Sequence, residues 1–113
     1  MAKQKLMTKA IEKQLPALYA TDKIPLKDKK VIVKFFCPTS NWTWYAFEYN
    51  PADKMFYGIV DGHELEQGYF SLREFEDLNV QFYAGRSRVW IERDYYFGTP
   101  IVGEIRELQG RLR

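Results

Sequence analysis

The sequence has 113 residues, 46% hydrophobic and 17% aromatic, and its 17 Lys and Arg face 15 Asp and Glu for a net charge of +2. The length fits one domain, which we place at residues 1–113, and the apolar content excludes a disordered chain. The balanced charge excludes a uniformly basic nucleic-acid wrapper and an acidic solvating tail.

Three features of the chain indicate a cytoplasmic protein that does not engage a membrane. No window reaches the ~18 apolar residues of a membrane span. Residues 1–14 are positively charged but lack the apolar core of a secretory signal. The only cysteine, Cys37, allows no intrachain disulfide, so we expect it to be a structural thiol in a reducing compartment.

The small net charge hides an uneven distribution along the chain. Residues 1–34 contain nine Lys against three acids, residues 35–84 two basic residues against eight acids, and residues 85–113 six Arg against four acids. Separated charge can attract a charged partner even when the total is small. The alternative is internal pairing, in which the basic ends cover the acidic middle.

The N-terminal third predicts one helix and one strand. Residues 8–19 carry apolar side chains at helical spacing after Thr8, a suitable N-cap, and Pro16 should kink or end this helix. Residues 20–30 form a polar loop. Residues 31–37 are rich in β-branched and aromatic residues and predict a strand.

Three further strands, separated by turn sequences, complete an antiparallel meander; they are predicted at 42–49, 54–60 and 64–70. The first, WTWYAFEY, carries aromatic residues on both faces, which predicts a central strand. The last is more acidic and predicts an edge. Strict alternation of side chains in residues 42–49 would place one set on a common face: Trp42, Trp44, Ala46 and Glu48.

The rest of the chain predicts two helices and extended segments. Ser71 to Glu74 match the S-x-x-E capping box, which starts a helix of about two turns. Residues 80–83 predict a strand fragment and residues 88–97 a strand or extended arm. Thr99 and Pro100 suit the start of a last helix, with apolar positions at Ile101, Ile105, Leu108 and Leu112. We therefore expect an α+β fold, with a curled antiparallel sheet of four to five strands flanked by two to three short helices.

The aromatic residues have three interpretations. A domain with three Trp, eight Tyr and eight Phe must bury most of them, so packing in the core comes first. A protein interface and the stacking of unpaired bases are the alternatives. The basic loop before residue 90 suits either a solvated hairpin tip or phosphate contacts. The candidate interface or nucleic-acid-binding residues are Trp42, Trp44, Tyr69, Arg86, Arg88 and Trp90.

The sequence contains no established catalytic or metal-binding pattern such as HExxH, CxxC or an EF-hand loop. Asp61, His63 and Glu64 are weak candidate metal ligands, which Glu92 and Asp94 would have to join in a small metal-dependent hydrolase. The alternative interpretation of the histidine is an exposed turn residue. We expect no catalytic residues, no cofactor and no enzymatic activity.

Four segments, SNWTWYAFEY at 40–49, VDG at 60–62, GYFSLREFE at 68–76 and ERDYYF at 92–97, resemble the bacterial domain-of-unknown-function family number 2958. The resemblance covers about residues 6–100. Members are small proteins encountered in plasmids, integrative elements and phages, so the resemblance implies a role in a mobile genetic element and no particular reaction.

Size, charge separation and this resemblance lead to one main functional hypothesis. We expect a non-enzymatic binding protein of a mobile genetic element whose partner is a protein or nucleoprotein complex of the bacterial host. Its specific form would be an inhibitor of a host defence complex, of the anti-CRISPR or anti-restriction type. A single-stranded nucleic-acid-binding accessory protein is the first alternative, and a small metal-dependent hydrolase is the second.

Overall fold

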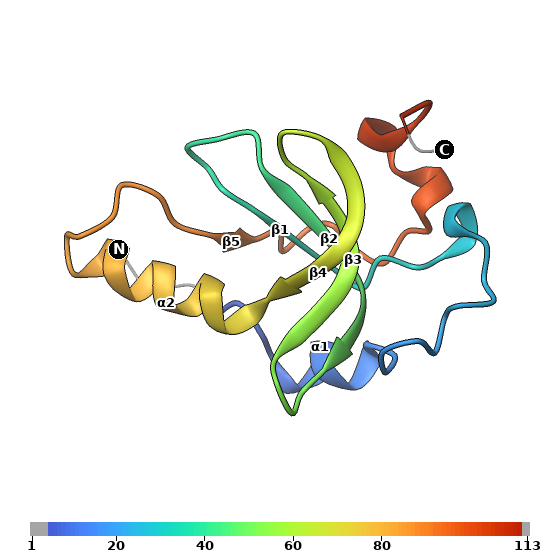
Figure 1. Ribbon diagram of the computed structural model, residues 1–113, viewed down its shortest axis with the longest axis horizontal. Coiled ribbons are helices and arrows are strands. Elements are labelled where there is room, and N and C mark those ends of the chain that lie inside the picture. Colours follow the sequence, from blue (N-terminus) through green and yellow to red (C-terminus); the bar gives the residue numbers. More distant parts are fainter. Residues whose placement is uncertain (1–4, 112–113) are drawn as a thin grey trace.

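The computed structural model describes residues 5–111. Its centre is a five-stranded antiparallel sheet in the order β4-β3-β2-β1-β5 (Figure 1). The first four strands form the predicted meander, with β2 at the centre and β4 at an edge, as their sequences indicate. The strands are β1 Val33–Phe36, β2 Thr43–Asn50, β3 Met55–Asp61, β4 Leu65–Ser71 and β5 Glu92–Arg93.

Two α-helices begin at the predicted caps. The Thr8 hydroxyl accepts a hydrogen bond from the Ile11 amide over 3.1 Å at the start of α1 (Lys9–Gln14). The Ser71 hydroxyl does the same for the Glu74 amide, also over 3.1 Å, at the start of α2 (Leu72–Tyr83). The first helix is shorter than predicted and ends just before the Leu15-Pro16 pair, because proline lacks the amide hydrogen that would continue it.

After the meander, one sequence prediction is wrong and another is confirmed only in part. Residues 80–83 belong to the end of α2 rather than to a strand, because the helical spacing that begins at Leu72 continues to Phe82. Of the predicted strand at 88–97, only β5 pairs, through the register Phe35 with Arg93 and Phe36 with Glu92.

The predicted last helix is replaced by two short 3₁₀ helices, η2 (Val102–Glu104) and η3 (Arg106–Leu108). Its buried side chains, Val102, Ile105 and Leu108, recur at every third residue, which is the period of a 3₁₀ helix. The segment is also held by the backbone, since the Val102 amide donates to the Lys29 carbonyl over 3.0 Å. The predicted apolar position Leu112 lies outside the described residues.

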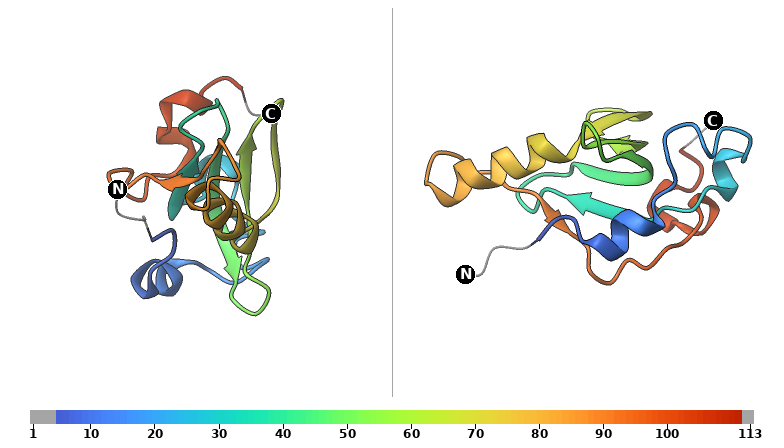
Figure 2. Two further views of the ribbon diagram at one scale, coloured as in Figure 1. Left: turned by 90° about the vertical axis from the view of Figure 1, so that its left-hand side faces the viewer. Right: turned by 90° about the horizontal axis from the view of Figure 1, so that it is seen from below.

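The sheet is not strongly curled, contrary to the sequence-based expectation. Its two faces are each covered by other segments, so the aromatic side chains are buried without closure of the sheet on itself. The two views of Figure 2 show these layers, with α2 on one side of the sheet and the C-terminal segment on the other.

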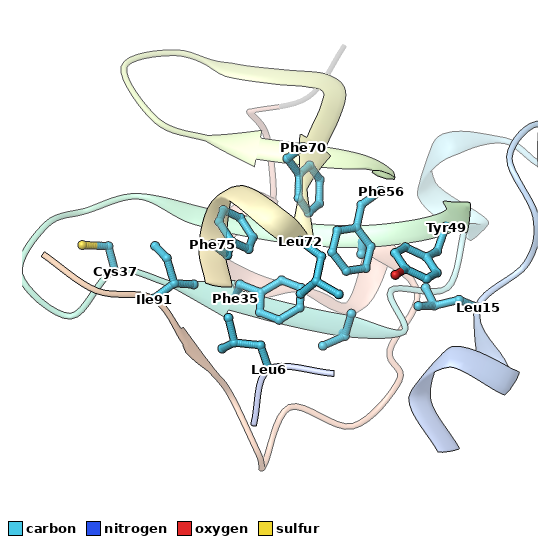
Figure 3. Packing of buried hydrophobic residues seen from close by; sticks show 12 residues of the cluster. Leu6, Leu15, Phe35, Cys37, Tyr49, Phe56, Phe70, Leu72, Phe75 and Ile91 are labelled. Atoms are coloured by element: carbon cyan, nitrogen blue, oxygen red, sulfur yellow. The ribbon is translucent and has the colours of Figure 1, made fainter. Parts of the chain in front are cut away.

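We call the first side the helix face, because α2 covers it together with the N-terminal segment. Phe35 lies at its centre, with ring centroids 5.3 Å from both Phe56 and Phe75 (Figure 3). Cys37 is buried in the same cluster, as expected of a structural thiol. The cluster consists of Leu6, Leu15, Val33, Phe35, Cys37, Ala46, Tyr49, Phe56, Phe70, Leu72, Phe75 and Ile91.

We call the opposite side the C-terminal face. Its core consists of Val31, Tyr45, Phe47, Ile59, Val102, Ile105 and Leu108. The guanidinium of Arg111 forms a two-pronged ion pair with the Asp61 carboxylate at the end of β3, over 2.9 and 3.1 Å. Here the basic C-terminal segment does cover an acidic position of the sheet, which is the internal pairing that the charge pattern left open.

A β-bulge in β2 changes which side chains share a face. Ala46 pairs with Gly58, but the next paired residue is Glu48, opposite Tyr57, so Phe47 is the extra residue. As a result Glu48 lies on the C-terminal face beside Phe47, whereas strict alternation had placed it with the tryptophans. Beyond the bulge, Tyr49 lies on the helix face.

Candidate functional site

The second half of α2 and the loop after it project beyond the sheet (Figures 1 and 2). We call residues 79–91 the arm. The chain runs out along the helix, turns at Gly85, whose φ is +76°, and returns toward β5. An αL residue after a helix is a common way to reverse the chain, and glycine adopts it without strain.

Side-chain contacts join the two limbs of the arm. The side-chain nitrogen of Asn79 donates to the Ile91 carbonyl over 2.9 Å, and the side-chain oxygen of Asn79 accepts from the Ile91 backbone amide over 2.7 Å. The Phe82 and Trp90 rings are stacked, with centroids 4.4 Å apart. The Trp90 indole N–H donates to Glu92 over 2.7 Å. The arm is therefore a fixed projection and not a loose loop.

The surface of the arm combines apolar and basic side chains. Val80 is 59% exposed and Val89 38%. Arg86 and Arg88 are also exposed, and residues 79–91 contain no acid. Arginine beside exposed apolar groups is typical of protein interfaces, and its planar fork fits carboxylates and phosphates.

The six predicted interface residues do not form one patch. Arg86, Arg88 and Trp90 belong to the arm. Trp44 is half-buried, with its ring centroid 4.8 Å from that of Phe75, so it packs under the first turns of α2. The remaining two residues lie elsewhere.

Trp42 is also half-buried, and its ring centroid is 5.9 Å from that of Trp44. These two tryptophans extend the core cluster of the helix face, in line with the core interpretation of the aromatic run. Tyr69 lies on the opposite side of the sheet, where it is 52% exposed and its hydroxyl donates to that of Tyr19 over 3.3 Å.

The hydrolase candidates do not converge on one cleft. Glu92 and Asp61 lie in the same row of the sheet but three strands apart, which corresponds to about 14 Å. The Glu92 carboxylate accepts a hydrogen bond from the Trp90 indole N–H, and the Asp94 carboxylate lies 3.7 Å from the Lys34 ammonium nitrogen.

The metal candidates at the β3–β4 turn are likewise not assembled into a site. His63 is exposed, and its ring rests edge-on against Trp42 at 5.2 Å, which matches a turn histidine. Glu64 is exposed beside it. Within residues 5–111, no group of three or more His, Cys, Asp or Glu side chains is arranged to hold a metal ion.

Sequence reasoning missed a buried polar cluster on the C-terminal face. Glu48 is 2% exposed and Lys29 7%, and both contact Thr21. Nothing in the lysine-rich loop distinguishes residue 29 from its exposed neighbours. The only sequence feature that indicated a special role for Glu48 was that it is the one acidic residue in an aromatic strand. Its position on this face depends on the bulge, which arises from the pairing of β2 with β3.

These features describe a small α+β domain built on one antiparallel sheet, with a basic, apolar arm on one side and a buried polar cluster on the other. The chain belongs to the family described as "Protein of unknown function (DUF2958)", whose model matches residues 6–102. This confirms the resemblance seen in the sequence. Searches of curated proteins and of solved structures gave no significant match. None of the helices in residues 5–111 combines the length and apolar character that crossing a membrane requires.

Proposed function

We propose that this chain is a non-enzymatic binding protein that engages a protein partner through the arm. The observation that carries the proposal is the combination of exposed Val80 and Val89 with Arg86 and Arg88 on a projection that is braced from within. A braced surface loses little conformational entropy on binding, which leaves more of the interaction energy for affinity.

The chemistry of the arm favours a partner that carries carboxylates around an apolar patch. Arg86 and Arg88 would pair with those carboxylates, and the two valines would bury apolar surface at the centre of the contact. Base stacking on Trp90 is less favourable, because one face of its ring is covered by Phe82 and its N–H is bound to Glu92. A protein is therefore preferred over single-stranded nucleic acid.

The cellular location and the kind of partner in this proposal come from the family resemblance. We place the protein in the bacterial cytoplasm, encoded by a mobile genetic element, with a host defence complex as the partner to be tested first. An inhibitor of such a complex would need a stable contact surface and no catalytic centre, which suits a small domain with one projecting arm.

The proposal is tested by affinity capture from a bacterial lysate with tagged protein, with and without nuclease treatment. Three forms are compared: wild type, the arm variant Arg86→Glu/Arg88→Glu, and a matched control, Lys9→Glu/Lys13→Glu, which reverses two exposed charges on α1. We expect a protein that survives nuclease treatment, is held by wild type and control, and is lost from the arm variant.

Two outcomes would contradict the proposal. Capture that disappears after nuclease treatment would favour the nucleic-acid alternative. Equal capture by the arm variant and wild type would show that the arm is not the interface.

A further inference from the structure

A pocket of about 480 Å³ lies on the C-terminal face, on the side of the sheet opposite α2. This volume lies within the range of small-molecule sites. Three tyrosines from three segments line it: Tyr57 and Tyr69 come from the paired strands β3 and β4, and Tyr19 from the loop after α1. The buried polar cluster of Glu48 and Lys29 also borders the pocket.

The tyrosine walls are fixed by contacts among themselves. Tyr57 and Tyr69 are direct cross-strand partners, and their rings meet edge to face with centroids 5.0 Å apart. The Tyr69 hydroxyl donates to that of Tyr19 over 3.3 Å, and the Tyr57 hydroxyl donates to Gln67 over 3.4 Å. The hydrogen bond to Tyr19 is the main cause that raises the pKa of Tyr69 to about 12.

The buried Glu48 carboxylate, at the base of the pocket, holds the loop that carries Tyr19 in place. The Glu48 carboxylate accepts hydrogen bonds from the Tyr19 amide over 2.8 Å and from the Thr21 amide over 3.1 Å, and the Thr21 hydroxyl donates to it as well. Tyr19 has a φ of +73°, in the left-handed region that non-glycine residues rarely adopt. Such backbone geometry costs free energy and is found preferentially at functional sites.

The charges around the pocket favour a cationic ligand. Glu48 and Asp22 contribute two carboxylates, whereas Lys29 contributes one ammonium group. That ammonium group already donates to the carbonyl and hydroxyl of Thr21, and it lies over the Phe47 ring at 5.8 Å. The net charge of these three groups is therefore −1, and it lies beside three electron-rich tyrosine rings.

We propose that this pocket binds an alkylated ammonium group. Aromatic rings attract such cations through their negative faces, and a trimethylammonium group offers apolar methyls to the rings while it spreads its charge. The same group occurs in choline-type small molecules and in trimethylated lysine side chains. This site lies on the opposite side of the sheet from the arm, so it is independent of the proposed protein interface.

The test is a titration of the full chain, followed by NMR of the tyrosine rings, with choline and with its uncharged isostere 3,3-dimethyl-1-butanol. We expect saturable shifts at Tyr57 and Tyr69 with choline, and binding of the isostere at least about tenfold weaker, because it lacks the charge. A short peptide with trimethyllysine, compared with choline, distinguishes the two sources of the group.

Variants separate ring chemistry from folding. Tyr69→Phe keeps the ring and should retain choline affinity within about twofold, whereas Tyr69→Ala should lose at least about tenfold. Tyr96→Ala is the matched control, since Tyr96 is 96% exposed and lies outside the pocket. The proposal is overturned if neither cation binds, if the isostere binds as well as choline, or if Tyr69→Ala binds choline like wild type.

Discussion

The backbone amide of Thr21 donates a hydrogen bond to the buried Glu48 carboxylate over 3.1 Å, although 27 residues separate the two in the sequence. The other carboxylate oxygen accepts from the Tyr19 amide over 2.8 Å. This carboxylate therefore ties the loop after α1 to the centre of the sheet. It also satisfies the backbone amide of Thr21, which would otherwise be buried without a partner.

Replacement of Glu48 by Gln should destabilise the protein. Charge-assisted hydrogen bonds to Tyr19 and Thr21 are weakened, and the buried ammonium of Lys29 loses the nearby negative charge. We expect the free energy of unfolding in urea to fall by about 1–3 kcal/mol. Glu66→Gln, at an exposed position of β4, is the control and should change it by less than about 0.5 kcal/mol. Equal effects of the two substitutions would contradict the role of Glu48.

The bulge in β2 requires glycine on the facing strand. A Cβ at Gly58 would lie 1.8 Å from the Tyr45 carbonyl oxygen, whereas a Cβ at Gly68, its direct partner on β4, meets nothing within 4 Å. Gly58→Ala should therefore cost at least about 2 kcal/mol or prevent folding, and Gly68→Ala should stay within about 0.5 kcal/mol. Thermal unfolding of both variants tests the pair. Similar melting temperatures would show that the close approach is not required.

The stability of the protein should fall at alkaline pH because of Tyr45. Burial, followed by the charges of Glu107 and Asp61, raises the pKa of this phenol to about 12 from an ordinary value of 10.0. A raised folded-state pKa means that the contribution is complete below pH 10 and is lost as the pH rises toward 12. The loss should be on the order of 2 kcal/mol.

The matching experiment measures the free energy of unfolding in urea at several pH values between 9 and 12. Tyr45→Phe should remove this part of the decline. Tyr96→Phe, at an exposed position, should keep the wild-type profile. A Tyr45→Phe profile with the wild-type slope would contradict the assignment.

The Asn79 side chain should be required for the order of the arm. It makes two hydrogen bonds to the backbone of Ile91, over 2.9 and 2.7 Å, and so joins the helix to the returning strand. Asn79→Ala should lower the free energy of unfolding by about 1–3 kcal/mol and speed hydrogen exchange at the Ile91 amide. Gln81→Ala, at an exposed position of the same helix, is the control. Unchanged exchange at Ile91 would show that the arm is held by other contacts.

Local chemistry made part of the fold predictable. The capping hydroxyls of Thr8 and Ser71, the turn sequences between strands and the central position of the aromatic strand follow from residues adjacent in the chain. The two 3₁₀ helices at the C-terminus do not. Their period of three is set by the sheet surface against which Val102 and Ile105 pack, and a sequence window contains no information about that surface.

Likewise, one part of the candidate site could be predicted from the sequence and another part could not. The basic loop with Arg86, Arg88 and Trp90 was recognisable because its composition is local. The pocket was not, because it assembles Tyr19 and Tyr57 from distant segments around a carboxylate. The face on which Glu48 lies depends on a bulge, and a single inserted residue reverses every alternation that follows it.

The dissociation constant between purified partner and purified protein decides whether the arm is a protein interface. It is measured for wild type, for Arg86→Glu/Arg88→Glu and for the control Lys9→Glu/Lys13→Glu. We predict binding at least about tenfold weaker for the arm variant and within about twofold of wild type for the control. An arm variant that binds as tightly as wild type would show that the arm is not the protein interface.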